Sequence, residues 1–219
     1  MRSKRVHLPL LVALASALAF SQAAAADRQP VSFNAADQAA ARAAVLKKAD
    51  FAGAAGWTGG MTKPDFTPSP CGGYEPKSSD LVVTGAAVSR WKHTSGAALV
   101  TEAWVLKTSA MVKLDWQRSV TRPGYLTCLV RKQFAEAGTK IISLKQIPFP
   151  NLTPLTRRYR LLVDYTTQAR SVRVMFDLIL IGKGRTELTL TAVAPYAARA
   201  AVEATQLRIA RKLVARATA

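Results

Sequence analysis

The sequence predicts an α+β fold, in which an antiparallel sheet of about six strands packs against helices. Three observations predict this class. Segments with β-like composition occur in runs joined by short polar turns, not in strict alternation with helices. Segments with helical patterns gather at the start, in the middle and at the end of the chain. One segment, Val172–Ile181, is apolar on both faces, as expected for a central strand with layers above and below it.

The first residues have the composition of a secretory signal peptide. Basic residues precede an apolar run, Val6–Phe20, and small residues follow up to Ala26. The apolar run is shorter than the about 20 residues that a membrane-spanning helix needs. We therefore expect residues 1–25 to be a signal peptide, cleaved near Ala25 or Ala26 or kept as an anchor. Residues 26–219 are then expected to form one exported domain.

The first half of this domain is expected to hold one helix, one long loop and one hairpin. Asn34 is expected to cap a helix over Ala35–Lys48. Residues 53–79 carry six glycines and four prolines, which predicts an irregular loop without strands or helices. Two Val- and Ala-rich segments, Leu81–Trp91 and Ala97–Leu106, are expected to pair as a hairpin.

The second half begins with two helices and ends with four strands and a helix. Thr108 or Ser109 is expected to cap a helix that reaches about Ser119, and Pro123 to open another that reaches about Ala137. The four strands and the terminal amphipathic helix follow in order: Lys140–Ile147, Arg157–Tyr165, Val172–Ile181, Glu187–Val193 and Ala197–Arg216.

The register of the two most β-like strands can be predicted from side-chain alternation. Pairing Tyr165 with Val172 stacks apolar residues on one face, and a slip by one residue would reverse the faces. Each cross-strand ion pair on the other face is expected to contribute about 0.2–1 kcal/mol, as ordinary sheet stabilisation and not catalysis. These pairs are Asp164 with Arg173, and Arg160 with Asp177.

The chain is strongly basic, with 31 basic and 13 acidic residues and a formal charge of +18. Such a charge attracts anionic lipid or acidic envelope polymers, although scattered basic residues also fit a merely solvated surface. Nucleic acid is not an expected partner, because basic residues and aromatics are not interleaved. Arg157 and Arg158, near a strand start, are candidate anion contacts. Trp57 and Tyr74, in the Gly- and Pro-rich stretch, are candidate ligand contacts.

Both cysteines, Cys71 and Cys128, lie in the exported part, and an even number in an oxidising compartment suggests one disulfide. The alternative is a pair of buried thiols. A disulfide would tether the loop at 53–79 to the rest of the domain. The chain-entropy model gives such a bond about 4 kcal/mol of stabilisation.

The usual catalytic residue types are scarce. His93 is the only histidine after the signal peptide, so a zinc site built on several histidines cannot form. A Ser–His–Asp triad would depend on a hairpin tip, which is a poor place for an acid–base group. Two carboxylates can hydrolyse glycosides without histidine, but no motif links two of them. The candidate carboxylates are Glu75, Asp80, Glu102, Asp115, Asp164 and Asp177.

Short stretches of the domain carry a family resemblance based on packing and cysteine positions. These are Leu46–Phe51, Gly56–Trp57, the loop around Cys71, Leu81–Ala87, Ser109–Trp116, Cys128–Leu129 and the closing helix. They resemble secreted actinobacterial sensor-type domains, such as the extracellular sensor of PknH-type Ser/Thr kinases and lipoproteins of the Mog1/PsbP-like α+β fold. The kinase sensors have two disulfides where this chain has at most one. The resemblance implies an extracytoplasmic binding or sensing module and no particular ligand.

Together these features predict an exported, non-enzymatic binding or sensor-like domain at the bacterial cell envelope, with an unknown ligand. We expect a monomer that uses no cofactor and no metal. Two alternatives remain open. One is a basic envelope-associated protein that binds acidic polymers or anionic lipid, and the other is a hydrolase whose pocket encloses two carboxylates.

Overall fold

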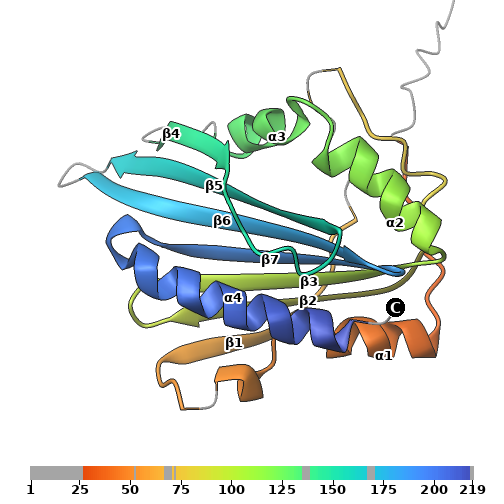
Figure 1. Cartoon of the computed structure of the whole chain (residues 1–219), viewed down its shortest axis with the longest axis horizontal. Helices are drawn as coiled ribbons and strands as arrows, with labels where there is room; N and C mark the ends of the chain where they lie inside the picture. Colours follow the sequence, from red (N-terminus) through yellow and green to blue (C-terminus); the bar gives the residue numbers. More distant parts are fainter. Residues whose placement is uncertain are drawn as a thin grey trace, which may run out of the picture.

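The computed structural model describes residues 27–51, 53–66, 71, 73–134, 139–166 and 171–217. The predicted signal peptide lies outside these residues. The described chain forms a seven-stranded antiparallel sheet and four α-helices, as the predicted α+β class requires (Figure 1). The strands are β1 Trp57–Thr62, β2 Val83–His93, β3 Ala98–Leu106, β4 Thr139–Gln146, β5 Leu155–Thr166, β6 Ser171–Lys183 and β7 Thr186–Pro195. The helices are α1 Ala35–Ala43, α2 Ser109–Asp115, α3 Tyr125–Gln133 and α4 Arg199–Arg216.

The strands lie in the order β1-β2-β3-β7-β6-β5-β4, and each pairs antiparallel with its neighbours. The predicted register between β5 and β6 is confirmed, because Tyr165 lies opposite Val172. Both predicted ion pairs form. The Nε atom of Arg173 lies 2.8 Å from Asp164 Oδ1, and the Nε atom of Arg160 lies 2.6 Å from Asp177 Oδ1.

Strand β1 corrects the prediction that residues 53–79 hold no regular structure. Trp57–Thr62 pairs with β2 along its whole length at the edge of the sheet. Gly59 makes this pairing possible, because a Cβ at that position would lie 2.1 Å from the Arg90 carbonyl oxygen. The glycine that suggested a loop therefore permits a close approach between two strands.

Helix α1 is shorter than predicted and ends at Ala43 instead of Lys48. Asn34 caps its start as expected, because its Oδ1 accepts a hydrogen bond from the Asp37 N–H at 2.9 Å. Beyond the helix, the backbone N–H groups find other acceptors. The Leu46 N–H donates to Thr101 Oγ1 and the Lys47 N–H donates to Asp50 Oδ2, each at 2.9 Å. A 3₁₀ turn, η1 Lys48–Phe51, follows.

The two faces of the sheet are covered differently (Figure 1). Helices α1 and α4 cover one face and enclose the main hydrophobic core, which includes Leu46, Leu190 and Leu213. A smaller cluster around Val112 joins α2 to the opposite face. A π-helical turn, η2 Trp116–Val120, continues α2, where a regular helix to about Ser119 was expected. Single turns of this kind are often found at functional sites.

Cys71 and Cys128 form the predicted disulfide, which joins the segment before β2 to helix α3. None of the helices in the described part of the chain is long and apolar enough to cross a membrane.

Candidate functional site

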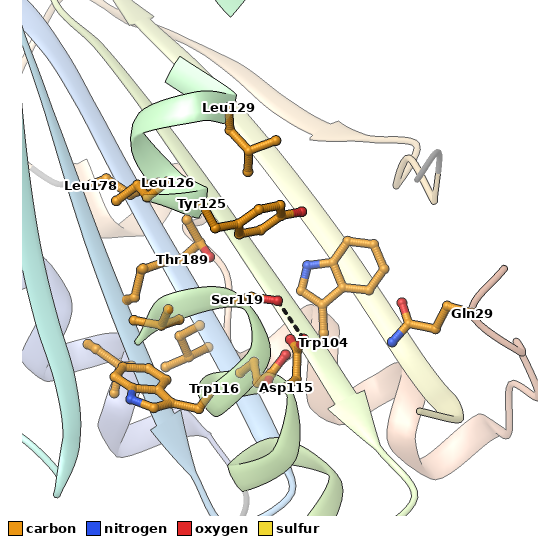
Figure 2. A pocket seen from close by; sticks show the side chains of 15 residues that line it. Gln29, Trp104, Asp115, Trp116, Ser119, Tyr125, Leu126, Leu129, Leu178 and Thr189 are labelled. Carbon is orange, nitrogen blue, oxygen red and sulfur yellow. Dashed lines mark hydrogen bonds between the residues drawn. The ribbon is translucent and has the colours of Figure 1, made fainter. Parts of the chain in front are cut away.

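A hollow lies between the sheet and the covering formed by α2, η2 and α3. We call its deepest part the inner cavity, which has a volume of about 320 Å³ (Figure 2). Strands β3, β6 and β7 form its floor, and Leu126 and Leu129 of α3 form part of its roof. Leu178 and Leu180 of β6 face it and stay partly exposed. Its volume is in the range of small-molecule sites.

Two further cavities adjoin the inner cavity. The outer cavity, of about 450 Å³, shares Leu126, Leu178 and Thr189 with it and continues between α3 and strands β5 and β6. Phe134 and Phe176 meet edge to face along its wall. The N-terminal cavity, of about 220 Å³, shares four residues with the inner cavity and opens toward the segment before α1. The shared residues are Gln29, Trp104, Ser119 and Tyr125.

The covering of the inner cavity is held in place by polar contacts. Arg118 of η2 forms a bidentate ion pair with Asp80, at 2.6 and 3.0 Å. The Tyr159 hydroxyl of β5 donates to the Val120 carbonyl at 3.2 Å. The disulfide ties α3 to Cys71. The hollow is therefore bounded by elements fixed to the sheet and to the preceding loop.

Two carboxyl groups meet inside the inner cavity, and we call them the acid pair. Asp115 ends α2, and Glu187 lies on β7 beside Trp104 of β3. The Ser119 hydroxyl donates to Asp115 Oδ1 at 2.9 Å, as Figure 2 shows. Burial raises the pKa of Glu187 well above its usual value. The charge of Asp115 and a hydrogen bond with that residue raise the pKa of Glu187 further. Glu187 therefore keeps its proton to higher pH than a solvent-exposed glutamate would.

Arg118 lies close enough to Asp115 for their opposite charges to attract, but neither member of the acid pair forms a salt bridge in the part of the chain that the structure describes. A third acid, Glu102, lines the outer cavity. Burial raises the pKa of Glu102. The charge of Arg90 and a hydrogen bond with Trp104 lower this pKa, but burial has the larger effect. Carboxyl groups with raised pKa values in a cavity are typical of functional sites.

The residues predicted from the sequence as ligand or anion contacts are dispersed. Trp57 stacks on Phe51 and lines a separate cavity of about 190 Å³ near α4. Tyr74 lies behind the covering of the inner cavity. Its ring meets Tyr125 edge to face, and its hydroxyl donates to the Arg118 carbonyl at 3.1 Å. It therefore supports the site without lining it.

Arg157 and Arg158 point to opposite faces of β5, as neighbours on a strand must. The Arg157 side chain donates to its neighbour's carbonyl, that of Thr156, at 2.8 Å. Arg158 is only 7 % exposed, and its guanidinium is bound to Asp177 beneath α4. The charge of Arg158, one of the candidate anion contacts, is therefore compensated inside the protein.

No motif in the sequence singled out Glu187. Asp115 was among the candidate carboxylates, but nothing nearby in the sequence connects it with Glu187. One usable signal was the alternation along β7, which places Glu187, Thr189 and Thr191 on the face opposite α4. No group of three or more His, Cys, Asp or Glu side chains in the described part of the protein could hold a metal ion.

Comparison of the chain with protein-family models and with curated proteins gave no match. The resemblance to extracellular sensor domains therefore remains a prediction. The site has to be interpreted from its own geometry.

Proposed function

We propose that this protein is an exported, non-enzymatic binding domain that holds a small ligand with an apolar body in the hollow beneath α2, η2 and α3. The inner cavity carries this proposal. It leaves several leucine side chains partly exposed in a domain whose other face is covered by α1 and α4. Burying apolar surface contributes about 25 cal/mol per Å², so a ligand that covers the parts of these side chains that are still exposed gains affinity.

Two observations support the exported part of the proposal. The N-terminal residues have signal-peptide composition, and the two cysteines form a disulfide, which persists in oxidising compartments. The disulfide also fixes α3, from which the roof leucines project. A binding role fits a site that is held open by covalent and ionic contacts.

The proposal is tested by binding of pyrene, a neutral apolar fluorophore, to the mature protein. We expect saturable binding that Leu129→Trp weakens at least tenfold, because the larger side chain fills the inner cavity. Met61→Trp is the matched control, since Met61 is 52 % exposed on β1 and lies outside the hollow. Native mass spectrometry of protein purified from the envelope should show a bound small molecule. Absence of saturable pyrene binding, or equal loss in both variants, contradicts the proposal.

A hydrolase is the second candidate, because the inner cavity encloses two carboxyl groups, as such an enzyme requires. The distance between them argues against it. Paired carboxylates in glycosidases are about 5–9.5 Å apart, whereas Asp115 and Glu187 lie close enough for Asp115 to raise the pKa of Glu187. Turnover of chromogenic glycosides that Asp115→Asn abolishes would favour the hydrolase over the binding domain.

A further inference from the structure

Acidic residues gather at the hollow although the chain as a whole is basic. The chain has 31 basic and 13 acidic residues. No Lys, Arg or His is among the described residues that line the inner and N-terminal cavities. Five acidic residues line these two cavities: Asp27, Asp65, Glu75, Asp115 and Glu187.

Several acidic side chains elsewhere in the fold are paired with basic ones. Asp37 binds Arg185, Asp50 binds Arg216, and Asp164 binds Arg173. The acid pair differs, because two carboxyl groups face each other in an apolar cavity although basic residues are abundant in the chain. Two adjacent carboxyl groups in such surroundings destabilise each other's charged form, so the arrangement does not serve the stability of the free protein.

Aromatic rings line the same cavity. Trp104, Trp116 and Tyr125 line the same cavity as the acid pair, together with Ser119, and Figure 2 labels all four. Aromatic faces attract cations, and more strongly where water is excluded. Carboxylate oxygens accept strong hydrogen bonds from an ammonium group. The rings and the acid pair therefore favour the same kind of ligand group by two different interactions.

We propose that the ligand of the hollow is an organic monocation, with an ammonium head at Asp115 and Glu187 and an apolar body along Leu126 and Leu178. This inference rests on the proposed binding function and specifies the ligand class. The positive charge of the remaining surface does not oppose it, since charges more than about 8–10 Å away are largely screened at physiological salt. Signal-peptide cleavage after Ala26 would place a terminal ammonium at Glu75, whose Oε1 accepts from the Asp27 N–H at 3.1 Å.

The test compares three probes with the same chain and different heads: decylamine, decanol and decanoate, each displacing pyrene from the mature protein at pH 7. We expect decylamine, which is protonated at this pH, to bind at least tenfold more tightly than decanol, and decanoate to bind most weakly. Asp115→Asn, alone or with Glu187→Gln, should bring decylamine to within threefold of decanol. Asp164→Asn is the matched control, because it removes the same charge at an exposed ion pair outside the hollow.

The outcomes separate the two proposals. If pyrene binds and the three probes compete equally, or decanoate competes best, the hollow is a binding site but the monocation is wrong. If the decylamine preference survives in both acid-pair variants, the assigned head position is wrong. If pyrene does not bind saturably, the binding function fails and this inference fails with it.

Discussion

Replacing Asp177 by alanine should destabilise the fold far more than an ordinary cross-strand ion pair would suggest. Asp177 lies on β6 beneath α4, and its side chain is 0 % exposed. Its carboxylate accepts hydrogen bonds from Arg158 at 2.5 Å, from Arg160 at 2.6 and 2.7 Å, and from Gln206 at 2.9 Å. It is therefore the centre of a buried network that also docks α4 onto the sheet.

The expected magnitude follows from what the substitution leaves behind. Without the carboxylate, Arg158 and Arg160, which are 7 % and 12 % exposed, would share only Glu203 as an acidic partner. Removing one partner of a buried ion pair typically costs about 3–5 kcal/mol, because the remaining charge stays desolvated. This is several times the about 0.2–1 kcal/mol of an ordinary cross-strand pair. It is also a large part of the about 5–15 kcal/mol that holds a typical domain together.

The assay is urea unfolding of the mature, disulfide-intact protein near pH 7. Asp164→Ala is the control, because Asp164 lies on the adjacent strand and its partner Arg173 is 47 % exposed. That variant should lose at most about 1 kcal/mol. If Asp177→Ala loses no more than Asp164→Ala, with similar denaturant dependence for both, the reasoning about buried charge is refuted.

Four further predictions follow from other contacts. The Glu187→Gln variant should gain stability relative to wild type as pH rises above about 4.5. Burial, and then Asp115, raise the pKa of Glu187 in the folded state, so wild type loses stability once the carboxyl ionises in the unfolded chain. A stability difference in urea unfolding that does not change with pH would contradict this. The Asp80→Asn variant should be less stable than wild type above about pH 4, because the hydrogen bond from Arg118 lowers the pKa of Asp80 to about 2. This difference in stability should vanish as the pH falls toward 2, where the acid unfolding curves of variant and wild type should converge. Cys128→Ser should speed amide exchange in α3 and residues 73–80 before the sheet is affected, which hydrogen exchange with mass spectrometry measures. If the basic surface binds envelope polyanions, binding to anionic vesicles should weaken steeply between low and physiological salt, and sedimentation that does not depend on salt would oppose that role.

The parts of the fold that could be predicted are those governed by local pattern. Alternation along β5 and β6 fixed both faces, and the short connection left one register that satisfied apolar stacking and charge together. Asn34 and Thr108 cap helices as their side chains suggest. The burial of Asp177 could not be predicted in this way, because α4 supplies the cover and comes from the far end of the chain.

Strand β1 shows how a local signal can mislead. Glycine and proline density normally marks a loop, and much of residues 53–79 follows that rule. Within it, Gly59 serves a contact with β2 that only the assembled sheet contains. A glycine required by close approach and a glycine required by a turn look the same in a single sequence.

The acid pair could not be predicted for a related reason, and this bears on its interpretation. Asp115 ends a helix and Glu187 begins a strand, and they meet only because β7 lies between β3 and β6 while α2 crosses above it. Burial raises the pKa of Glu187, so placing it beside Asp115 destabilises the folded protein at pH values at which this carboxyl is ionised in the unfolded chain. A basic residue at either position would remove this opposition, and the chain has many basic residues elsewhere. A cationic ligand would remove it as well, and in doing so would convert a destabilising contact of the free protein into part of its binding energy.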